Sequence, residues 1–277
     1  MRRSTKCVAS SAAVALLVSL SACGTDIRVE TPGQANGPMV TIGVPADEPG
    51  MSWYHDGSYA GFSIDVATQV AKTMGYSSKQ IVFRSVEAGQ RGQMLADGQV
   101  DMVLGAYPRP TDGKAVVVDD VAYTDPYLVT GEAALMRAGE ERPDTLRGRV
   151  ACVTEGSVAA RTLAEDASGV KLERRSSFQQ CMSSLLAGVS DVVAAPEPVA
   201  LGLRQQTGDH YVDVVDESWH QVAFGIGVRP DQTMLVDSLN SAIALMVKDG
   251  SWQDGIDALH AQVGFDADMS ANPPVQP

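Results

Sequence analysis

The sequence has 277 residues, of which 44% are hydrophobic and 5% aromatic, and it carries a formal net charge of −13. This composition, with 26 glycines, is typical of a folded α/β protein and excludes a disordered chain. An acidic surface argues against nucleic acid as a partner and against attachment to anionic lipid by charge.

The first 22 residues are predicted to be a lipoprotein signal peptide. Three basic residues precede an apolar run over residues 8–20, which is shorter than the roughly 20 residues of a membrane span. The segment Leu20–Cys23 resembles a bacterial lipobox, in which the cysteine thiol receives the lipid. An ordinary secretory signal with a chance cysteine is the alternative. Residues 23–37 are rich in Pro, Gly, Gln and Asn, as in a flexible tether, so we expect an extracytoplasmic chain anchored to the cell membrane through Cys23.

Hydrophobic periodicity predicts alternating strands and helices from residue 39 onward. A first unit contains strands at 39–44, 80–85 and 100–105 and helices at 64–74, capped by Ser63, and 90–96. A second unit begins near Leu146, with strands at 149–154, 170–174 and 191–195 and helices at 157–167, 178–187 and 198–206. A strand at 221–228 and helices at 235–248 and 251–263 follow.

Two α/β units with buried strands predict parallel sheets covered by helices on both faces. The chain after about residue 224 lacks a unit of its own, so we expect it to return to the first unit. Residues 38–131 with 225–265 then form lobe 1, residues 132–224 form lobe 2, and residues 266–277 are expected to be disordered. Ligands of such sheets lie outside the carboxyl ends of the strands, here in the cleft between the lobes.

Two cysteines remain after Cys7 leaves with the signal peptide and Cys23 takes the lipid. Cys152 lies in a predicted strand and Cys181 on a predicted helix, and an even pair in an oxidising compartment favours a structural disulfide. A catalytic thiol or a metal site is the alternative. The four histidines form no spaced cluster that would support a metal, so we expect none.

Several segments resemble the bacterial extracellular solute-binding proteins of family 3, which bind polar amino acids. They are Gly61–Ala67, Leu95–Val103, Tyr123–Tyr127, Leu146–Val150 followed by Glu155-Gly156-Ser157, Phe224–Val228 and Asp249–Trp252. Each segment is weak alone, but their order over residues 40–263 is specific. The sequence is most similar in kind to the actinobacterial glutamate- and glutamine-type lipoproteins, which also carry a cysteine pair placed like Cys152 and Cys181. The resemblance implies a type II periplasmic-binding-protein fold, with two α/β lobes and a two-segment hinge, serving an ABC importer.

The resemblance also implies how an amino acid would be held, and this sequence departs from it twice. Gly156 and Ser157 match the family's hydroxyl turn, where a helix N-terminus binds an anion. The family's carboxylate-binding arginine falls on Lys114, with Arg109 as a rival, and a lysine cannot form the two-pronged contact of a guanidinium. The family's ammonium-binding aspartate falls on Pro196, so the neighbouring Glu197 is the candidate replacement.

Further candidates line the expected cleft. Arg91 falls where binders of acidic amino acids place an arginine, or it is an ordinary exposed helix residue. Asp47 and Glu48 follow the first strand, where they either favour a cationic ligand or are simply solvated. Three aromatic side chains are candidates for stacking on the ligand, although a core position is the commoner fate of such rings: Trp53, Tyr107 and Phe178.

We therefore expect a monomeric binding protein that closes its lobes on a small polar solute, an amino acid or a related charged nitrogenous compound. Its other partner is an ABC permease, and no cofactor is expected. The alternatives are a ligand-sensing lipoprotein that reports to a membrane receptor and a dehydratase-like enzyme on the same scaffold, although the sequence shows no paired acid and base in the cleft.

The lipobox generates the first testable prediction. Changing Cys23 to Ala removes the thiol that would carry the lipid, so the protein should move from the membrane fraction to the medium. Immunoblots of both fractions measure this, with Cys7→Ala as the matched control. A Cys23→Ala protein that stays in the membrane fraction would contradict lipid anchoring.

Overall fold

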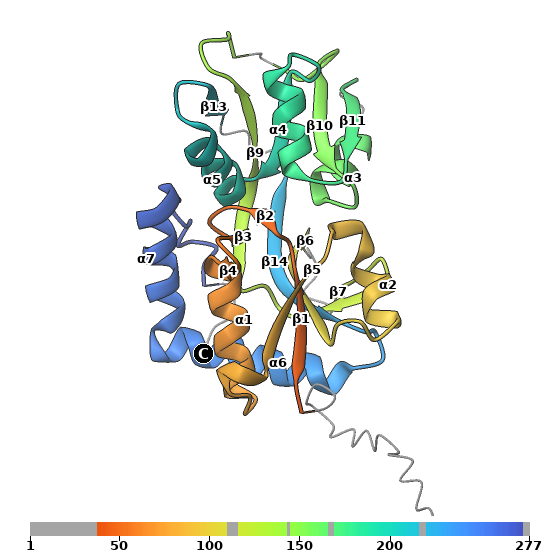
Figure 1. Ribbon diagram of the computed structural model, residues 1–277, viewed down its shortest axis with the longest axis vertical. Helices are drawn as coiled ribbons and strands as arrows, with labels where there is room; N and C mark the ends of the chain where they lie inside the picture. The colour runs from red at the N-terminus through yellow and green to blue at the C-terminus, as the bar shows by residue number, and fades with distance from the viewer. Residues whose placement is uncertain (1–37, 110–115, 143–144, 166–168, 216–219, 274–277) are drawn as a thin grey trace, which may run out of the picture.

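The computed structural model describes residues 38–109, 116–142, 145–165, 169–215 and 220–273. Cys23 and Lys114 lie outside these residues. Figure 1 shows two lobes, one above the other, with strands β9 (Leu128–Arg137) and β14 (Gln221–Val228) running between them. The expected two-lobed α/β architecture with a two-segment hinge is confirmed.

The lower lobe, lobe 1, is built from the two ends of the chain. Its strands are β1 (Val40–Val44), β2 (Asp47–Glu48), β3 (Ser52–His55), β4 (Ser58–Ala60), β5 (Ile81–Ser85), β6 (Met102–Pro108), β7 (Val116–Val118) and β8 (Val121–Tyr123). Its helices are α1 (Phe62–Thr73), α2 (Arg91–Ala96), α6 (Thr233–Asp249) and α7 (Ser251–Val263), with short 3-10 turns at Ser78–Gln80 and Ala88–Gln90. Helix α1 begins after Gly61 rather than after Ser63, whose hydroxyl instead lies 2.9 Å from the Tyr127 hydroxyl.

The upper lobe, lobe 2, follows the same alternation. Its strands are β10 (Val150–Thr154), β11 (Lys171–Arg175), β12 (Val192–Pro196) and β13 (Val212–Val215), and its helices are α3 (Val158–Glu165), α4 (Phe178–Leu186) and α5 (Glu197–Thr207). Pro198 occupies the first turn of α5, where its missing N–H breaks no helical hydrogen bond.

One sheet runs through both lobes in the order β11-β10-β12-β9-β14-β6-β1-β5. Strand β1 pairs in parallel with β5 and β6, and β10 pairs in parallel with β11 and β12, whereas β9 and β14 pair antiparallel with each other and with their neighbours. The hairpin pairs β2–β3, β3–β4 and β7–β8 are also antiparallel. Strand β9 was not predicted from the sequence, because Leu128–Arg137 is an almost continuous buried run without the alternation that marks a half-exposed strand. The hairpin strands β2–β4, β7–β8 and strand β13 were also not predicted.

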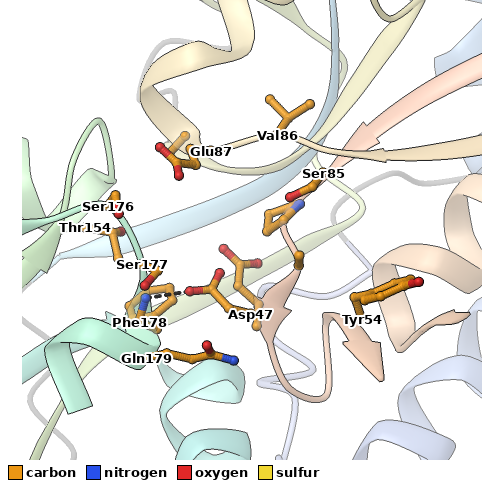
Figure 2. Close-up of a pocket in the computed structure, with 14 residues that line it drawn as sticks. Asp47, Tyr54, Ser85, Val86, Glu87, Thr154, Ser176, Ser177, Phe178 and Gln179 are labelled. Atoms are coloured by element: carbon orange, nitrogen blue, oxygen red, sulfur yellow. Dashed lines mark hydrogen bonds between the residues drawn. The ribbon is translucent and has the colours of Figure 1, made fainter. Parts of the chain in front are cut away.

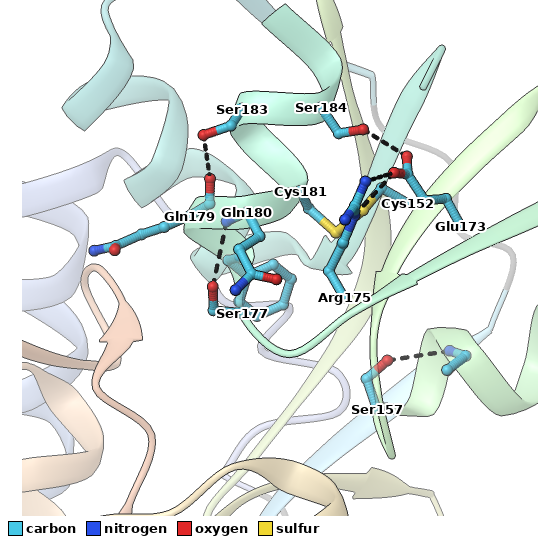
Figure 3. The surroundings of a disulfide bond; sticks show 12 residues. Cys152, Ser157, Glu173, Arg175, Ser177, Gln179, Gln180, Cys181, Ser183 and Ser184 are labelled. Carbon is cyan, nitrogen blue, oxygen red and sulfur yellow. Dashed lines mark hydrogen bonds and ion pairs between the residues drawn. A yellow bond between two sulfur atoms is a disulfide. The ribbon is translucent and has the colours of Figure 1, made fainter. Parts of the chain in front are cut away.

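The predicted disulfide is confirmed. Figure 3 shows the sulfur atoms of Cys152, in β10, and Cys181, in α4, bonded to each other, with their Cα atoms 5.4 Å apart. The bond ties the sheet of lobe 2 to a covering helix across 29 residues of sequence, and closing a loop of this length stabilises by about 3–4 kcal/mol on the chain-entropy model.

The C-terminal segment differs from the sequence prediction. Residues 266–273 were expected to be disordered, but Asn272 is only 4% exposed and its side chain binds the hinge strand β9. The Val129 N–H donates to Asn272 Oδ1 at 2.9 Å, and Asn272 Nδ2 donates to the Val129 carbonyl at 2.8 Å. The amide thus satisfies both backbone groups of a buried hinge residue, which polar composition alone does not reveal.

This contact yields a prediction about stability. Asn272→Ala leaves the Val129 N–H and C=O without their partner in a buried setting, which should lower the free energy of unfolding by about 1–3 kcal/mol. Chemical denaturation measures the change, with Ser270→Ala, on the same segment and exposed, as the control. Equal stability of the two variants would show that the segment does not support the hinge.

Candidate functional site

The two lobes touch directly along the cleft between them. A Cβ atom at Gly156 of lobe 2 would lie 2.5 Å from the Gly89 Cα of lobe 1, and one at Gly202 would lie 2.1 Å from the Pro49 carbonyl oxygen. Both separations are shorter than any normal van der Waals contact, so these positions require glycine for the lobes to approach. The structure is therefore a closed arrangement of the clamp.

The larger cavity of the cleft has a volume of about 310 Å³ and is shown in Figure 2. It is lined from lobe 1 by residues that follow β1 and β5 and from lobe 2 by residues that follow β10 and β11. The lining residues are Pro45, Ala46, Asp47, Glu48, Tyr54, Ser85, Val86, Glu87, Ala88, Thr154, Ser176, Ser177, Phe178 and Gln179. Three of them are carboxylic acids and none is a cation, so we call this cavity the acidic pocket.

Asp47 joins the lobes at this pocket. Its Oδ2 accepts a hydrogen bond of 2.5 Å from the backbone N–H of Phe178, the first residue of α4. The helix begins there because the Ser177 side chain caps it, accepting from the Gln180 N–H at 3.2 Å. A helix N-terminus favours a negative charge. Burial raises the pKa of Asp47, and the N–H groups of Phe178 and Gln179 oppose this rise.

Glu48, beside it, is 7% exposed, and its Oε2 has no hydrogen-bond partner within the described structure. Burial raises the pKa of Glu48 to about 8, and the positive charge of Arg91 only partly opposes this rise. At neutral pH Glu48 is therefore mostly a neutral acid, which can donate one hydrogen bond and accept another. A cation placed beside it would restore the charged form.

Arg91 is buried rather than an exposed helix residue, with 5% of its surface accessible. Its Nη1 donates to the Ala106 carbonyl at 2.8 Å and reaches the Tyr123 hydroxyl at 3.5 Å, while Nε has no partner among the described residues. The guanidinium lies over Gly105, where a Cβ would come within 2.0 Å of Nη2. Gly105 is therefore required for Arg91 to enter the cleft.

A second, smaller cavity of about 20 Å³ lies between Arg91 and the start of α3. Its lining residues are Ala88, Arg91, Ala106, Tyr107, Pro108, Val118, Asp119, Val121, Tyr123, Gly156, Ser157, Val158 and Arg161. Ser157 caps α3, because its Oγ accepts from the Ala160 N–H at 3.1 Å. With two arginines and a helix N-terminus in its wall, we call this cavity the basic pocket.

Three other sequence candidates are engaged by neighbouring residues. Trp53 stacks on His55, with ring centroids 4.3 Å apart, and lines neither pocket. Tyr107 reaches the basic pocket, but its ring is buried against Tyr123 and its hydroxyl donates to the Thr124 carbonyl at 2.9 Å. Arg109 is exposed and donates to the Gln221 side chain instead.

Glu197 does not lie in the cleft cavities. Its Oε2 accepts from the Thr130 hydroxyl at 3.4 Å, and it lines a third cavity of about 180 Å³ beside the C-terminal segment. The residue follows Pro196, the last of β12, so the chain has already turned into α5 when Glu197 is reached. Proximity in sequence to Pro196 therefore does not bring this carboxylate to the two cleft pockets.

Sequence reasoning missed a buried carboxylate on the hinge strand. Glu132 of β9 is directly opposite Pro196 in the register of β9 and β12, and it is 1% exposed. The Thr162 hydroxyl donates to its Oε2 at 3.2 Å, and Oε1 has no partner in the described part of the chain. Burial raises the pKa of Glu132 to about 7. The only sign of this residue in the sequence was a single acid at the start of the otherwise apolar stretch 132–136.

Within the described ranges, no group of three or more His, Cys, Asp or Glu residues is placed to hold a metal ion. The same residues include no helix both long and apolar enough to cross a membrane.

The model of the bacterial extracellular solute-binding proteins, family 3, matches residues 40–258. The chain belongs to this family. It is 29% identical to the glutamate-binding protein GluB of Corynebacterium efficiens, over 95% of both chains, and 21% identical to the ABC transporter glutamine-binding protein GlnH of Bacillus subtilis, over 72% and 71%.

Solved structures agree on the fold. An ancestral arginine-binding protein bound to glutamine superposes with a TM-score of 0.70 at 25% identity, covering 80% of this chain and 98% of that one. The solute receptor for L-cysteine of Neisseria gonorrhoeae gives 0.73 at 20% identity, covering 86% and 95%. The type II fold is thus confirmed, and this family of extracellular proteins places the chain outside the cytoplasm.

The buried acids generate a prediction about pH. Glu132 and Glu48 titrate near 7 and 8 in the folded state and near 4.5 when unfolded, so folding takes up protons between these values. Stability should therefore fall as the pH rises from about 5 to 8. Glu132→Gln keeps the shape without the charge, so this variant should lose less stability over that range, and its advantage over wild type should be largest at pH 8.

Urea denaturation at pH 5, 6, 7 and 8 measures these slopes. Asp257→Asn, which removes an exposed carboxylate on α7, is the matched control. Parallel slopes for wild type and Glu132→Gln would show that Glu132 does not take up a proton on folding.

Proposed function

We propose that this chain is the solute-binding component of an ABC importer and that it captures a small amino acid with one carboxylate and a cationic or amide far end. The observation that carries the proposal is the division of charge in the cleft. The basic pocket holds Arg91, Arg161 and the start of α3, whereas the acidic pocket holds Asp47, Glu48 and Glu87. Ala88 lines both cavities, so the two pockets adjoin, and we infer that one solute contacts both.

Each pocket suits one end of such a solute. A carboxylate in the basic pocket would receive charge-assisted hydrogen bonds from guanidinium groups, the strongest kind available to it. An ammonium, guanidinium or amide in the acidic pocket would satisfy the unpartnered Oε2 of Glu48. A second carboxylate there would meet like charges, since Asp47 and Glu87 lie in the same wall.

The relatives do not decide the ligand by themselves. Their names include glutamate, glutamine, cystine and arginine as ligands, at identities between 21% and 29%. The carboxylates of the acidic pocket favour the glutamine and arginine kinds over glutamate, although glutamate is the ligand named for the relative at 29% identity.

Binding without turnover is part of the proposal. The curated relatives are named as binding proteins, and one structural neighbour is an ancestral amino-acid-binding protein described as a precursor of cyclohexadienyl dehydratase. General acid–base catalysis needs a group within hydrogen-bond reach of the proton it moves. Asp47 is instead engaged by the N-terminus of α4, a contact that suits lobe closure. We also propose that the chain acts as a monomer tethered to the membrane through Cys23.

Calorimetry with L-arginine, L-glutamine, L-glutamate and L-aspartate tests the ligand class. L-arginine or L-glutamine should bind at least about tenfold more tightly than either dicarboxylate, a difference of about 1.4 kcal/mol. Glu87→Gln should narrow that preference, because it removes a negative charge from the acidic pocket. Asp257→Asn is the control for a surface charge change. Tightest binding of L-glutamate would overturn the proposed ligand class, and binding of none of the four would overturn amino-acid capture.

A further inference from the structure

An ion pair crosses the mouth of the basic pocket from one lobe to the other. Arg161 of α3, in lobe 2, donates through Nη2 to Asp119 Oδ2 at 2.6 Å, and Asp119 belongs to the turn between β7 and β8 in lobe 1. Both residues also line the pocket. Their side chains are 39% and 62% exposed, and an ion pair this exposed contributes about 0–1 kcal/mol.

The position of Asp119 is fixed by its backbone. Asp119 and Asp120 both have positive φ angles, 50° and 60°, and they connect the paired residues Val118 and Val121 in a two-residue hairpin turn. The turn rests on α2, because a Cβ at Gly92 would lie 2.4 Å from the Asp119 carbonyl oxygen. The carboxylate is therefore held at the pocket rim by lobe 1, whereas Arg161 is carried by lobe 2.

Arg91 lines the same pocket as this pair. Arg91 is 5% exposed, its Nε is without a hydrogen-bond partner in the described ranges, and its Nη1 contacts two neutral groups, the Ala106 carbonyl and the Tyr123 hydroxyl. The buried acid Glu48 interacts with the Arg91 charge, but burial raises the pKa of Glu48 to about 8, so it offsets that charge only in part at neutral pH. A buried guanidinium whose charge is offset only in part attracts an anion into the pocket.

We propose that Arg161 is a specificity-determining residue that binds the solute's carboxylate from lobe 2, opposite Arg91, and that Asp119 holds Arg161 in place until the solute arrives. This inference rests on the proposed function. The exchange is favourable because the pair with Asp119 is solvent-exposed, whereas a carboxylate between two guanidiniums and the start of α3 is shielded from water.

The exchange also links recognition to closure. Arg161 reaches the basic pocket only when α3 lies against lobe 1, as the close approach of Gly156 to Gly89 shows it does here. A solute with a carboxylate therefore gains a contact that exists only in the closed clamp. A solute of the same shape without that charge leaves Arg161 paired with Asp119, so it gains no binding energy from Arg161.

The test compares an amino acid with its α-carboxamide, using L-arginine with L-argininamide and L-glutamine with L-glutamine α-amide. Isothermal titration should show that Arg161→Gln weakens binding of the two amino acids at least about tenfold. The affinity for the two amides should change by less than about threefold. Asp119→Asn removes the competing carboxylate, so it should tighten binding of the two amino acids by about two- to fivefold. Arg149→Gln is the matched control, because it removes a lobe 2 arginine that pairs with Asp191 outside both pockets.

The outcomes separate this inference from the proposed function. If Arg161→Gln weakens binding of the amino acids and the amides equally, Arg161 only holds the lobes together. If the affinity for the amino acids is unchanged, Arg161 has no role in binding. Either result overturns the inference. Wild-type protein that binds none of the four compounds overturns the proposed function together with it. Thermal melting of each variant confirms that it is folded.

Discussion

The pairing of β9 with β14 is the constraint on which the rest of the molecule depends. The chain leaves lobe 1 along β9 and returns along β14, and backbone hydrogen bonds hold the two strands antiparallel from Leu128 to Gly131. Each lobe builds its own parallel strands outward from this pair. Two adjacent strands can bend together without breaking either lobe, which is the geometry of a hinge motion. The Asn272 side chain and the Trp252 Nε1, which donates to the Tyr127 carbonyl at 2.7 Å, brace the lobe 1 end of β9.

Closure about this hinge brings unlike charges and dipoles together. Asp47 of lobe 1 meets the N-terminus of α4, and Asp119 of lobe 1 meets Arg161 of lobe 2. The exposed Asp119–Arg161 pair contributes only about 0–1 kcal/mol, so it orients the lobes without holding them shut. The solute must supply the remaining stabilisation of the closed state, because a ligand shifts the equilibrium only by its differential affinity for the two states.

The sequence was most informative where local patterns decide the structure. Helices α5 and α7 were predicted at 198–206 and 251–263, within one residue of their observed bounds, because periodicity and turn chemistry are short-range properties. Strand β9 was missed, since a strand buried on both faces shows no alternation. Arg91 and Glu48 were found by their positions relative to motifs, but their burial depends on Gly105 and on lobe closure, which no local pattern encodes.

The errors at the site have the same cause. Glu197 was chosen because it follows Pro196, yet the chain turns into α5 there, and the carboxylate paired opposite Pro196 is Glu132 of a neighbouring strand. Arg161 was not considered, because its partner Asp119 lies 42 residues away and in the other lobe. Contacts between elements distant in sequence depend on the register of strands and on the relative position of the lobes.

The central claim is that the lobes close on an amino acid, and a distance between them tests it most directly. Spin labels at Val82→Cys in β5 and Leu186→Cys in α4, two exposed positions on opposite lobes, report that distance by pulsed electron resonance in the secreted Cys23→Ala form. Saturating L-arginine or L-glutamine should narrow the distribution of distances to a single short distance, and L-argininamide should narrow it less. A distribution that neither amino acid changes would contradict closure on an amino acid.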